Sequence, residues 1–206
     1  MTQEERSQRS RAKILKAALD LFSHRGYGAT SMRDIAEKAG ASIGSVYHQF
    51  AEKEEIFRTL LDQYWAAIAS PDFPVNRALA HSAFPGNLEL LGRASRDSII
   101  QYRPYVALIY VDVVEFEGRH IRKFYADMAQ RFQAFIDRQP DKHQIEAQMR
   151  PGVPAASAMM LASRIFLNYF AVEILFGVEN HFGMDSDHAL KEISDILLHG
   201  ILRQNS

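Results

Sequence analysis

The chain has 206 residues, of which 47% are hydrophobic, a formal net charge of −1 and no cysteine. This length exceeds that of one typical domain but is short for two independent ones, and the apolar fraction can fill a sizeable core. The absence of cysteine excludes disulfides, thiolate metal sites and cysteine nucleophiles.

The first predicted element is an amphipathic helix from Ser7 to about Arg25, ended by Gly26. Its apolar residues recur on one face at helical spacing and are Ile14, Leu15, Ala18, Leu21 and Phe22. The cations near its start could lie along phosphates or merely keep a frayed terminus soluble; they are Arg6, Arg9, Arg11 and Lys13. The leading residues lack the apolar core of a signal peptide, and no run reaches the roughly 18 uncharged apolar residues of a spanning helix. We therefore expect a soluble, cytoplasmic protein that does not enter a membrane.

Two short helices joined by a tight turn are predicted within residues 30–53. Ser31 can cap the first helix by accepting a hydrogen bond from the N–H of Asp34, whose carboxylate can reach back to form a capping box. Gly40 stands where the chain needs a left-handed turn. Ser42 then offers a second cap at the start of the next helix.

The second of these helices has few apolar residues that could pack in a core. Only Val46 and Phe50 are spaced to reach a core, and the residues that face outward are Ser42, Ile43, Gly44, Ser45, Tyr47, His48 and Gln49. A glycine inside a helix costs about 1 kcal/mol relative to alanine. A helix that accepts this cost and turns small polar residues outward is suited to close approach to another surface, and the DNA major groove admits one α-helix. The pattern is typical of a helix-turn-helix reader of DNA.

From Arg11 to Leu60 the chain resembles the N-terminal domain of the TetR family of transcriptional regulators. The matching residues are Ile14, Ala18, Phe22, Gly26, Thr30, Ile35, Ala36, Ala39, Gly40, Ser42, Gly44, Tyr47, Phe50 and Lys53. Glu52 departs from the family, which usually has a small capping residue at that position. The resemblance implies a homodimer that binds double-stranded DNA at a palindromic operator, most often as a repressor that a small molecule releases.

The charge distribution agrees with this resemblance. Residues 1–53 hold nine Lys or Arg against six Asp or Glu, a balance of +3, and the remainder has a balance of −4. The basic excess lies in the segment expected to meet DNA, although a solvated face could show as much.

We expect an all-α protein of about nine helices, with a DNA-binding domain at residues 1–53. A helix over 54–69 would link it to a ligand-binding and dimerisation domain at 70–206. Residues 70–87 carry three prolines and a glycine and are expected to be mostly loop, with at most one short helix. The helices predicted beyond this loop span about 88–102, 104–118, 119–138, 154–176 and 185–203, and no strands are predicted.

The last two predicted helices carry more apolar surface than one small domain can cover. We therefore expect them to meet their counterparts in a two-fold four-helix bundle, as the family resemblance also implies. The predicted interface residues are Ile165, Val172, Leu190, Ile193, Leu197 and Ile201.

Each half of the dimer would contact DNA through two groups of residues. Arg33 is predicted to read a guanine, because its planar fork fits the O6 and N7 atoms, although it could instead touch a phosphate. The predicted base contacts on the recognition helix are Ile43, Gly44 and Ser45. The predicted phosphate contacts, which position the protein, are Ser31, Ser42, Tyr47, His48 and Lys53.

A mostly apolar effector pocket with a few polar anchors is expected among the C-terminal helices. Its candidate residues are Tyr102, Tyr105, Tyr110, Asp112, Glu115, Phe116, Phe124, Phe166, Asn168, Tyr169 and Phe170, with Arg164 as a further anchor. Asp112 and Glu115 lie one helical turn apart with His120 nearby, and could receive a cationic ligand or a metal ion. Alternatively Glu115 pairs with Arg119 at a spacing of four residues.

Two other classes of function compete with this interpretation. No nucleophile elbow, phosphate-cradling glycine loop or paired-histidine metal spacing occurs in the sequence, so we expect neither an enzyme nor a resident metal or cofactor. An all-α carrier of small molecules or lipids that lacks DNA binding remains the alternative.

Overall fold

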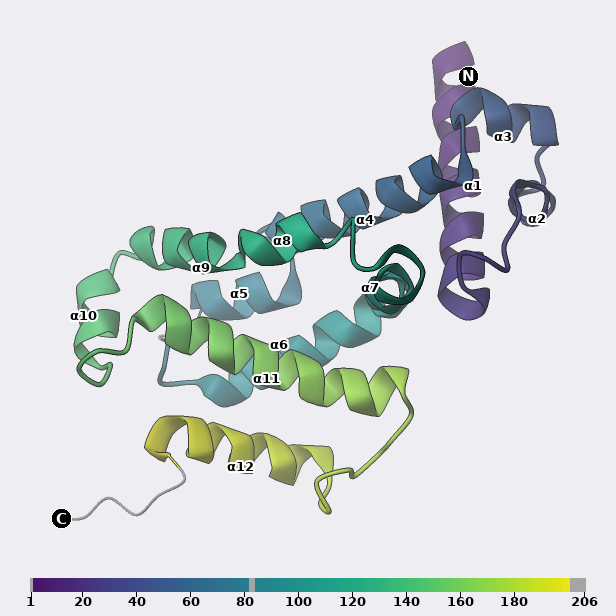
Figure 1. The fold of residues 1–206 in the computed structure, drawn as a ribbon. Helices are drawn as coiled ribbons and strands as arrows, with labels where there is room; N and C mark the ends of the chain where they lie inside the picture. The colour runs from purple at the N-terminus through teal and green to yellow at the C-terminus, as the bar shows by residue number, and fades with distance from the viewer. Residues whose placement is uncertain (1, 82–83, 201–206) are drawn as a thin grey trace. The chain divides into compact units, whose positions relative to one another are not determined.

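The computed structural model describes residues 2–81 and 84–200, and within these ranges all regular structure is helical (Figure 1). The predicted all-α class is confirmed. The chain forms two compact units: unit 1 is Met1–Ile68 with Pro104–Phe124, and unit 2 is Ala69–Arg103 with Tyr125–Ser206. The helices, in chain order, are α1 (Gln3–Arg25), α2 (Met32–Ala39), α3 (Ile43–Gln49), α4 (Lys53–Ala69), α5 (Pro74–His81), α6 (Leu88–Gln101), α7 (Arg103–Phe116), α8 (Arg122–Ala126), α9 (Met128–Asp137), α10 (Lys142–Ala147), α11 (Ala155–Leu175) and α12 (Ser186–His199).

Helix α1 begins earlier than its apolar pattern indicates, because a capping box precedes that pattern. The Thr2 hydroxyl accepts a hydrogen bond from the Glu5 N–H at 3.1 Å, and the Glu5 carboxylate accepts one from the Thr2 N–H at 2.7 Å. At the other end Gly26 has a φ of 85° and donates its N–H to the carbonyl of Phe22 at 3.1 Å. The helix therefore ends where the glycine predicted it.

The caps predicted for α2 and α3 are confirmed. The Ser31 hydroxyl accepts from the Asp34 N–H at 3.1 Å, and the Asp34 carboxylate accepts from the Ser31 N–H at 2.7 Å. Gly40 adopts the left-handed conformation with a φ of 62°. Ser42 accepts from the Ser45 N–H at 3.1 Å and so starts α3. Because each helix end has its own local partner, the turn between α2 and α3 is short and defined.

Unit 1 is built on one apolar cluster. Its buried members are Ile14, Leu15, Ala17, Ala18, Leu21, Phe22, Ile35, Ala36, Val46, Phe50, Ile56, Phe57, Leu60, Leu61, Leu108 and Ile121. The cluster draws on α1, α2, α4, α7 and the α7–α8 turn, together with one residue of α3 and Phe50 directly after it. The helix-turn-helix segment is therefore supported by residues far along the chain.

The inclusion of residues 104–124 in unit 1 differs from the predicted division, which assigned everything after residue 70 to a second domain. Leu108 is fully buried in the unit 1 cluster, and the ring of Phe116 lies 4.6 Å from that of Tyr27. The contact between Tyr27 and Phe116 joins residues 89 positions apart, and no local sequence pattern reports it.

Unit 2 is organised around α6, which contacts α5, α11 and α12. Gly92 on α6 permits this packing, because a Cβ atom at that position would overlap Leu190 of α12 and lie 3.1 Å from the ring of Phe166 on α11. Helix α11 also packs against α9. The core of this unit includes Phe166 and Phe170, which are 0% and 1% exposed.

Several helix bounds differ from the predicted ones. The continuous helix expected over 119–138 is divided into α8 and α9 at Asp127, whose φ of −83° and ψ of −3° keep it close to helical geometry. The short helices α5 and α10 also lie in segments where no regular element was assigned with defined bounds. The end predicted for the last helix, near residue 203, lies outside the described residues.

Helix α11 is, among the described residues, the one helix long and apolar enough by length and composition to cross a membrane. The sequence had been expected to contain no such segment, because Arg164 and Glu173 interrupt it. Nine of its residues are buried inside the unit, including Met159, Phe166 and Phe170. These buried positions are those of a core helix of a helical domain.

Candidate nucleic-acid interface

Helix α3 is held against the rest of unit 1 by one face. Val46 and Phe50 are 0% and 1% exposed. The Arg11 guanidinium of α1 lies 4.1 Å from the centre of the Phe50 ring, and it donates a hydrogen bond to the carbonyl of Gln49 at 3.0 Å. These contacts fix how closely α3 packs against unit 1 and where its C-terminal end lies.

The opposite face of α3 is open to solvent. Ile43 and Tyr47 are 42% and 54% exposed, and Ser42, Gly44 and His48 are also exposed. These five are among the nine residues predicted to meet DNA bases or phosphates. The structure brings them together on α3 and its N-cap, where Gly44 lets a partner approach the backbone.

Two residues of α3 expected to face outward are half-buried instead. The Ser45 hydroxyl lies 3.4 Å from the Ser10 hydroxyl, and the Gln49 amide donates to the Ser7 hydroxyl at 2.8 Å. Helix α1 begins before residue 7, so its first turns reach this side of α3. The position of Ser45 makes it a poorer candidate for base contact than Ile43 or Gly44.

Helix α2 presents the exposed side chain of Arg33, as a groove-reading role requires. The neighbouring Ser31 hydroxyl is already engaged, because it also donates to the Asp34 carboxylate at 2.6 Å. The hydrogen bonds from Ser31 hold the pKa of Asp34 below its ordinary value. A phosphate that uses the Ser31 hydroxyl would therefore compete with Asp34.

Lys53 differs from the simple phosphate contact that was predicted. Its ammonium donates to the carbonyls of Tyr27 and Thr30, both at 2.7 Å, and lies 4.0 Å from the centre of the Tyr27 ring. Burial lowers the pKa of this ammonium from its ordinary value. Since an ammonium has three donors, one remains for a further acceptor. In this structure the two hydrogen bonds of Lys53 hold the α1–α2 loop, residues 26–31.

Glu115 likewise faces the α1–α2 loop and not Arg119, which corrects the predicted pairing. Its Oε1 accepts from the Tyr27 N–H at 2.7 Å, and its Oε2 accepts from the Gly28 N–H at 2.5 Å. Arg119 pairs with Glu54 at 2.8 Å. The spacing of four residues could not reveal this arrangement, because both partners lie on distant segments.

Asp112 is fully buried, and its carboxylate forms hydrogen bonds within its own unit. Its carboxylate lies 2.6 Å from Nδ1 of His120, and the other ring nitrogen lies 3.2 Å from the carboxylate of Glu54. The group that could have received a cationic ligand or a metal ion is thus divided: Asp112 and His120 join α7 to α4, and Glu115 turns to the α1–α2 loop.

The remaining effector candidates are spread over both units. In unit 1, Tyr105 stacks on Tyr64 at 5.6 Å, Phe116 packs on Phe57 at 5.0 Å, Phe124 stacks on Trp65 at 3.9 Å, and Tyr110 is 40% exposed. In unit 2, Tyr102 lies 5.2 Å from Phe73, Phe166 and Phe170 are in the core, and Arg164 and Asn168 are exposed. These candidates thus divide between the two units, and within each unit the aromatic side chains pack against the neighbours given above.

Tyr169 is the candidate with a buried polar anchor. It is 3% exposed, and its hydroxyl donates to Glu173 at 3.1 Å. The hydroxyl of Ser186 donates to the same carboxylate at 2.9 and 2.8 Å. Burial, followed by the neighbouring Glu173 charge, raises the pKa of Tyr169 to about 12.

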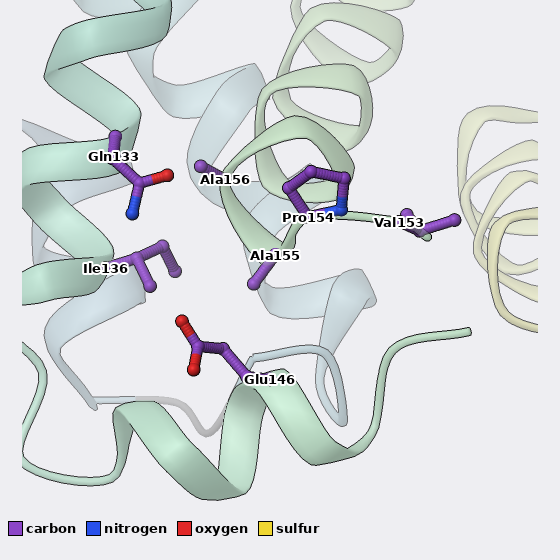
Figure 2. A pocket seen from close by; sticks show the side chains of 7 residues that line it. All are labelled: Gln133, Ile136, Glu146, Val153, Pro154, Ala155 and Ala156. Atoms are coloured by element: carbon purple, nitrogen blue, oxygen red, sulfur yellow. The ribbon is translucent and has the colours of Figure 1, made fainter. Parts of the chain in front are cut away.

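A pocket of unit 2 that the sequence did not predict lies between α9, α10 and the start of α11 (Figure 2). It has a volume of about 160 Å³, below the roughly 300 Å³ at which pockets for drug-sized ligands begin. Its lining residues are Gln133, Ile136, Glu146, Val153, Pro154, Ala155 and Ala156. The amide of Gln133 and the carboxylate of Glu146 extend towards it from α9 and α10 (Figure 2).

The predicted dimer residues need a correction. Leu190 and Ile193 are 2% and 5% exposed within the single chain, so neither is available to a second copy. Their burial follows from the packing of α12 on α6, which helical periodicity alone could not distinguish from packing between copies. Ile165, Val172 and Leu197 are half-buried, and Ile201 lies outside the described residues. The more exposed apolar residues at these two helices include Leu161, Phe176, Ile196 and Leu198.

Known proteins resemble this chain most strongly in unit 1. The family described as "Bacterial regulatory proteins, tetR family" matches residues 14–60. The HTH-type transcriptional repressor KstR2 of Mycobacterium tuberculosis is 49% identical over 51 residues, which cover 25% of this chain and 26% of the repressor. The match to this curated relative thus spans about a quarter of its length.

Two further comparisons extend beyond the helix-turn-helix segment. The repressor KstR2 of Mycolicibacterium smegmatis is 29% identical over 142 residues, covering 64% of this chain and 68% of that protein. The crystal structure of the TetR family regulator PfmR from Thermus thermophilus is similar with a TM-score of 0.62 and 22% identity, over 99% of this chain and 100% of that one. The second likeness shows a shared fold along the whole chain.

Proposed function

We propose that the chain is a cytoplasmic repressor of the TetR family of DNA-binding transcriptional regulators, which are not enzymes. In this proposal two copies bind a palindromic operator, and a small, largely apolar effector releases them. The observation that carries the proposal is the orientation of α3: Val46 and Phe50 fix one face, and Ile43, Gly44 and Tyr47 occupy the open face. The repressor role is supported by the printed name of the relative from Mycobacterium tuberculosis.

Two classes of contact would serve different purposes. Ile43, Gly44 and Arg33 are proposed to lie against base edges, where Ile43 can contact a thymine methyl and Arg33 a guanine. Ser42, Tyr47 and His48, with the remaining donor of Lys53, would lie along phosphates, which set position but not sequence. One such helix reads only a few base pairs, so useful discrimination requires two of them about 34 to 36 Å apart on one duplex.

The second copy is proposed to cover exposed apolar residues of unit 2. Leu161 and Phe176 are 55% and 56% exposed, and Ile196 is 40% exposed. A homodimer that buries them would place the same surface on both protomers, as two-fold symmetry requires. In this division of labour unit 1 contacts DNA, and unit 2 supplies dimerisation and holds the effector.

The effector is proposed to bind among the apolar side chains between α6 and α11. Phe166, Tyr169 and Phe170 are buried residues of α11, and Phe166 lies beside Gly92 of α6. The Tyr169–Glu173 pair would supply a polar anchor on rearrangement. The pocket beside Gln133 is small, so binding of a larger molecule would require α9, α10 or α11 to move. An effector acts only if it favours the conformation that fits DNA poorly.

The proposal is tested by gel-shift titration with the DNA upstream of the protein's own gene. A sequence-specific complex with two protomers per duplex is expected, and apolar small molecules that raise the thermal unfolding temperature should dissociate it. Binding of apolar molecules without any DNA complex would instead identify a carrier protein.

A further inference from the structure

We propose that Glu115 is a positioning residue for DNA recognition: its carboxylate, bound by two successive backbone N–H groups, holds the α1–α2 loop, residues 26–31, and through it Ser31 and Arg33. The inference rests on the DNA-binding role proposed above and adds a residue that makes no contact with DNA itself. Glu115 lies on α7, 66 residues beyond Gln49, the last residue of α3.

The geometry of this contact is that of an anion in a backbone cradle. Each carboxylate oxygen receives one N–H, Oε1 from Tyr27 at 2.7 Å and Oε2 from Gly28 at 2.5 Å. Successive N–H groups that converge on one anion form a recurring binding site in proteins. Hydrogen bonds to an ionised carboxylate are shorter and stronger than those between neutral groups. The carboxylate therefore selects one conformation of the loop.

The loop sequence leaves room for the carboxylate. A Cβ atom added to Gly26 would lie 2.9 Å from Oε1, and one added to Gly28 would lie 2.9 Å from Oε2. Gly26 also has a φ of 85°, which itself favours glycine, whereas Gly28 has no such requirement. Gly28 thus has one evident structural reason to lack a side chain, which is the approach of Glu115.

Lys53 binds the carbonyl groups of the same loop. Its ammonium donates hydrogen bonds to the carbonyls of Tyr27 and Thr30, so an anion binds the N–H groups and a cation binds the carbonyls of the same few residues. The Tyr27 ring packs on Phe116, the residue next to Glu115. The loop is therefore held between α4 and α7.

The loop leads directly into the reading elements. Ser31, at its end, is the N-cap of α2, and Arg33 lies in the first turn of that helix. Helix α2 is followed by the short turn at Gly40 and then by α3. A displacement of the loop would move Arg33 relative to α3. Contacts with the major groove depend on the relative positions of Arg33 and α3. Helix α7, which carries Glu115, begins two residues after the end of α6 of unit 2. A movement of α6 could therefore be transmitted along the chain to Glu115.

The test is operator affinity of Glu115→Gln, measured by fluorescence anisotropy on the full-length protein. The amide keeps the shape but replaces one acceptor oxygen by a donor that faces an N–H, so we expect affinity to fall about 3- to 10-fold, allowing for the exposure of the site. Removal of one negative charge would by itself raise affinity for DNA. The sign of the change thus separates positioning from a charge effect.

The matched control is Glu117→Gln, which removes the same charge two residues further along the chain. It should leave affinity unchanged or slightly higher. In Glu115→Gln the salt dependence of binding should keep the wild-type slope, because no phosphate contact is lost. The Gly28 amide proton should also shift upfield in the NMR spectrum of this variant, and an unchanged Gly28 resonance would contradict the contact.

A second pair of variants tests the steric argument. Gly28→Ala should displace the carboxylate and weaken operator binding, but in the Glu115→Ala background the same change should have little further effect. Additive losses would overturn the inference, as would Glu115→Gln binding as tightly as wild type. If wild type itself binds no duplex, the proposed function fails instead, and the Gly28 resonance still reports on the contact.

Discussion

The guanidinium of Arg11 lies 4.1 Å above the Phe50 ring and donates to the carbonyl of Gln49 at 3.0 Å. Arg11 was one of four N-terminal cations for which phosphate contact and simple solubility were both open. The structure gives it a third role, because it binds the C-terminal end of α3, where carbonyl groups lack helical partners. The recognition helix is thus tied to α1.

Arg11→Met should therefore destabilise unit 1 by about 1–2 kcal/mol, since a cation–π contact and one hydrogen bond are lost while the apolar stem is kept. Urea unfolding measures this free energy. Lys13→Met, an exposed cation on the same helix, is the control and should change it by much less. Equal effects of the two changes would contradict the assignment.

Tyr47→Ala and Phe50→Ala should separate binding from stability. Tyr47 is 54% exposed, so its loss should weaken affinity for all duplexes alike and barely change the unfolding temperature. Phe50 is 1% exposed, so its loss should cost about 3–5 kcal/mol of folding free energy. A Tyr47→Ala protein that unfolds more easily but binds DNA normally would show that the open face of α3 does not meet DNA.

Arg33→Ala should relax sequence preference at one symmetric position of the operator, in addition to weakening binding. The expected loss of discrimination corresponds to about 1–3 kcal/mol, as for a bidentate contact to guanine. Competition between operators that differ at single base pairs measures it. A uniform loss over all the competing sequences would assign Arg33 to a phosphate.

The capping box of α2 predicts a pH dependence of stability. Hydrogen bonds from Ser31 hold the pKa of Asp34 below its ordinary value of 3.8, so the unfolded chain binds more protons there than the folded one. The stabilisation is present above pH 3.8 and is lost as the pH falls through the lower, folded pKa. In urea unfolding, the advantage of wild type over Asp34→Asn should therefore shrink below about pH 4, and an advantage that stays constant down to about pH 2 would contradict the assignment.

Phe176→Glu should dissociate the proposed dimer into folded monomers, because a charge would be placed on an exposed apolar residue. Ile193→Glu should instead unfold unit 2, since Ile193 is buried inside the chain. Sedimentation velocity and circular dichroism distinguish these results. A Phe176→Glu protein that still sediments as a dimer would place the interface elsewhere.

The sequence predicted best what is decided locally. The caps Ser31 and Ser42 and the turn at Gly40 depend on residues within four positions, and the structure has all of them. Periodicity likewise identified the apolar faces of α11 and α12. It could not show that Leu190 is covered by α6 of the same chain, because spacing reports that a face is buried and not what buries it.

Long-range contacts account for most of what the sequence could not provide. Glu115 contacts residues 87 and 88 positions away, and its spacing to Arg119 suggested a local pair that does not form. Lys53 was recognised from the family pattern, but its bonds to the α1–α2 loop depend on how α4 packs on α1. The apolar spacing also continues through Asp127, so it gave no sign of the division between α8 and α9.

The proposed function depends on two outward-facing α3 helices that read one duplex. Fluorescence anisotropy with a palindromic duplex from upstream of the gene, and with a scrambled duplex of equal length, tests it most directly at about 50 and 200 mM salt. We expect two protomers per duplex, a clear preference for the palindrome, and weaker binding of both duplexes at the higher salt. Equal affinity for the two duplexes, or binding that does not change with salt, would contradict it.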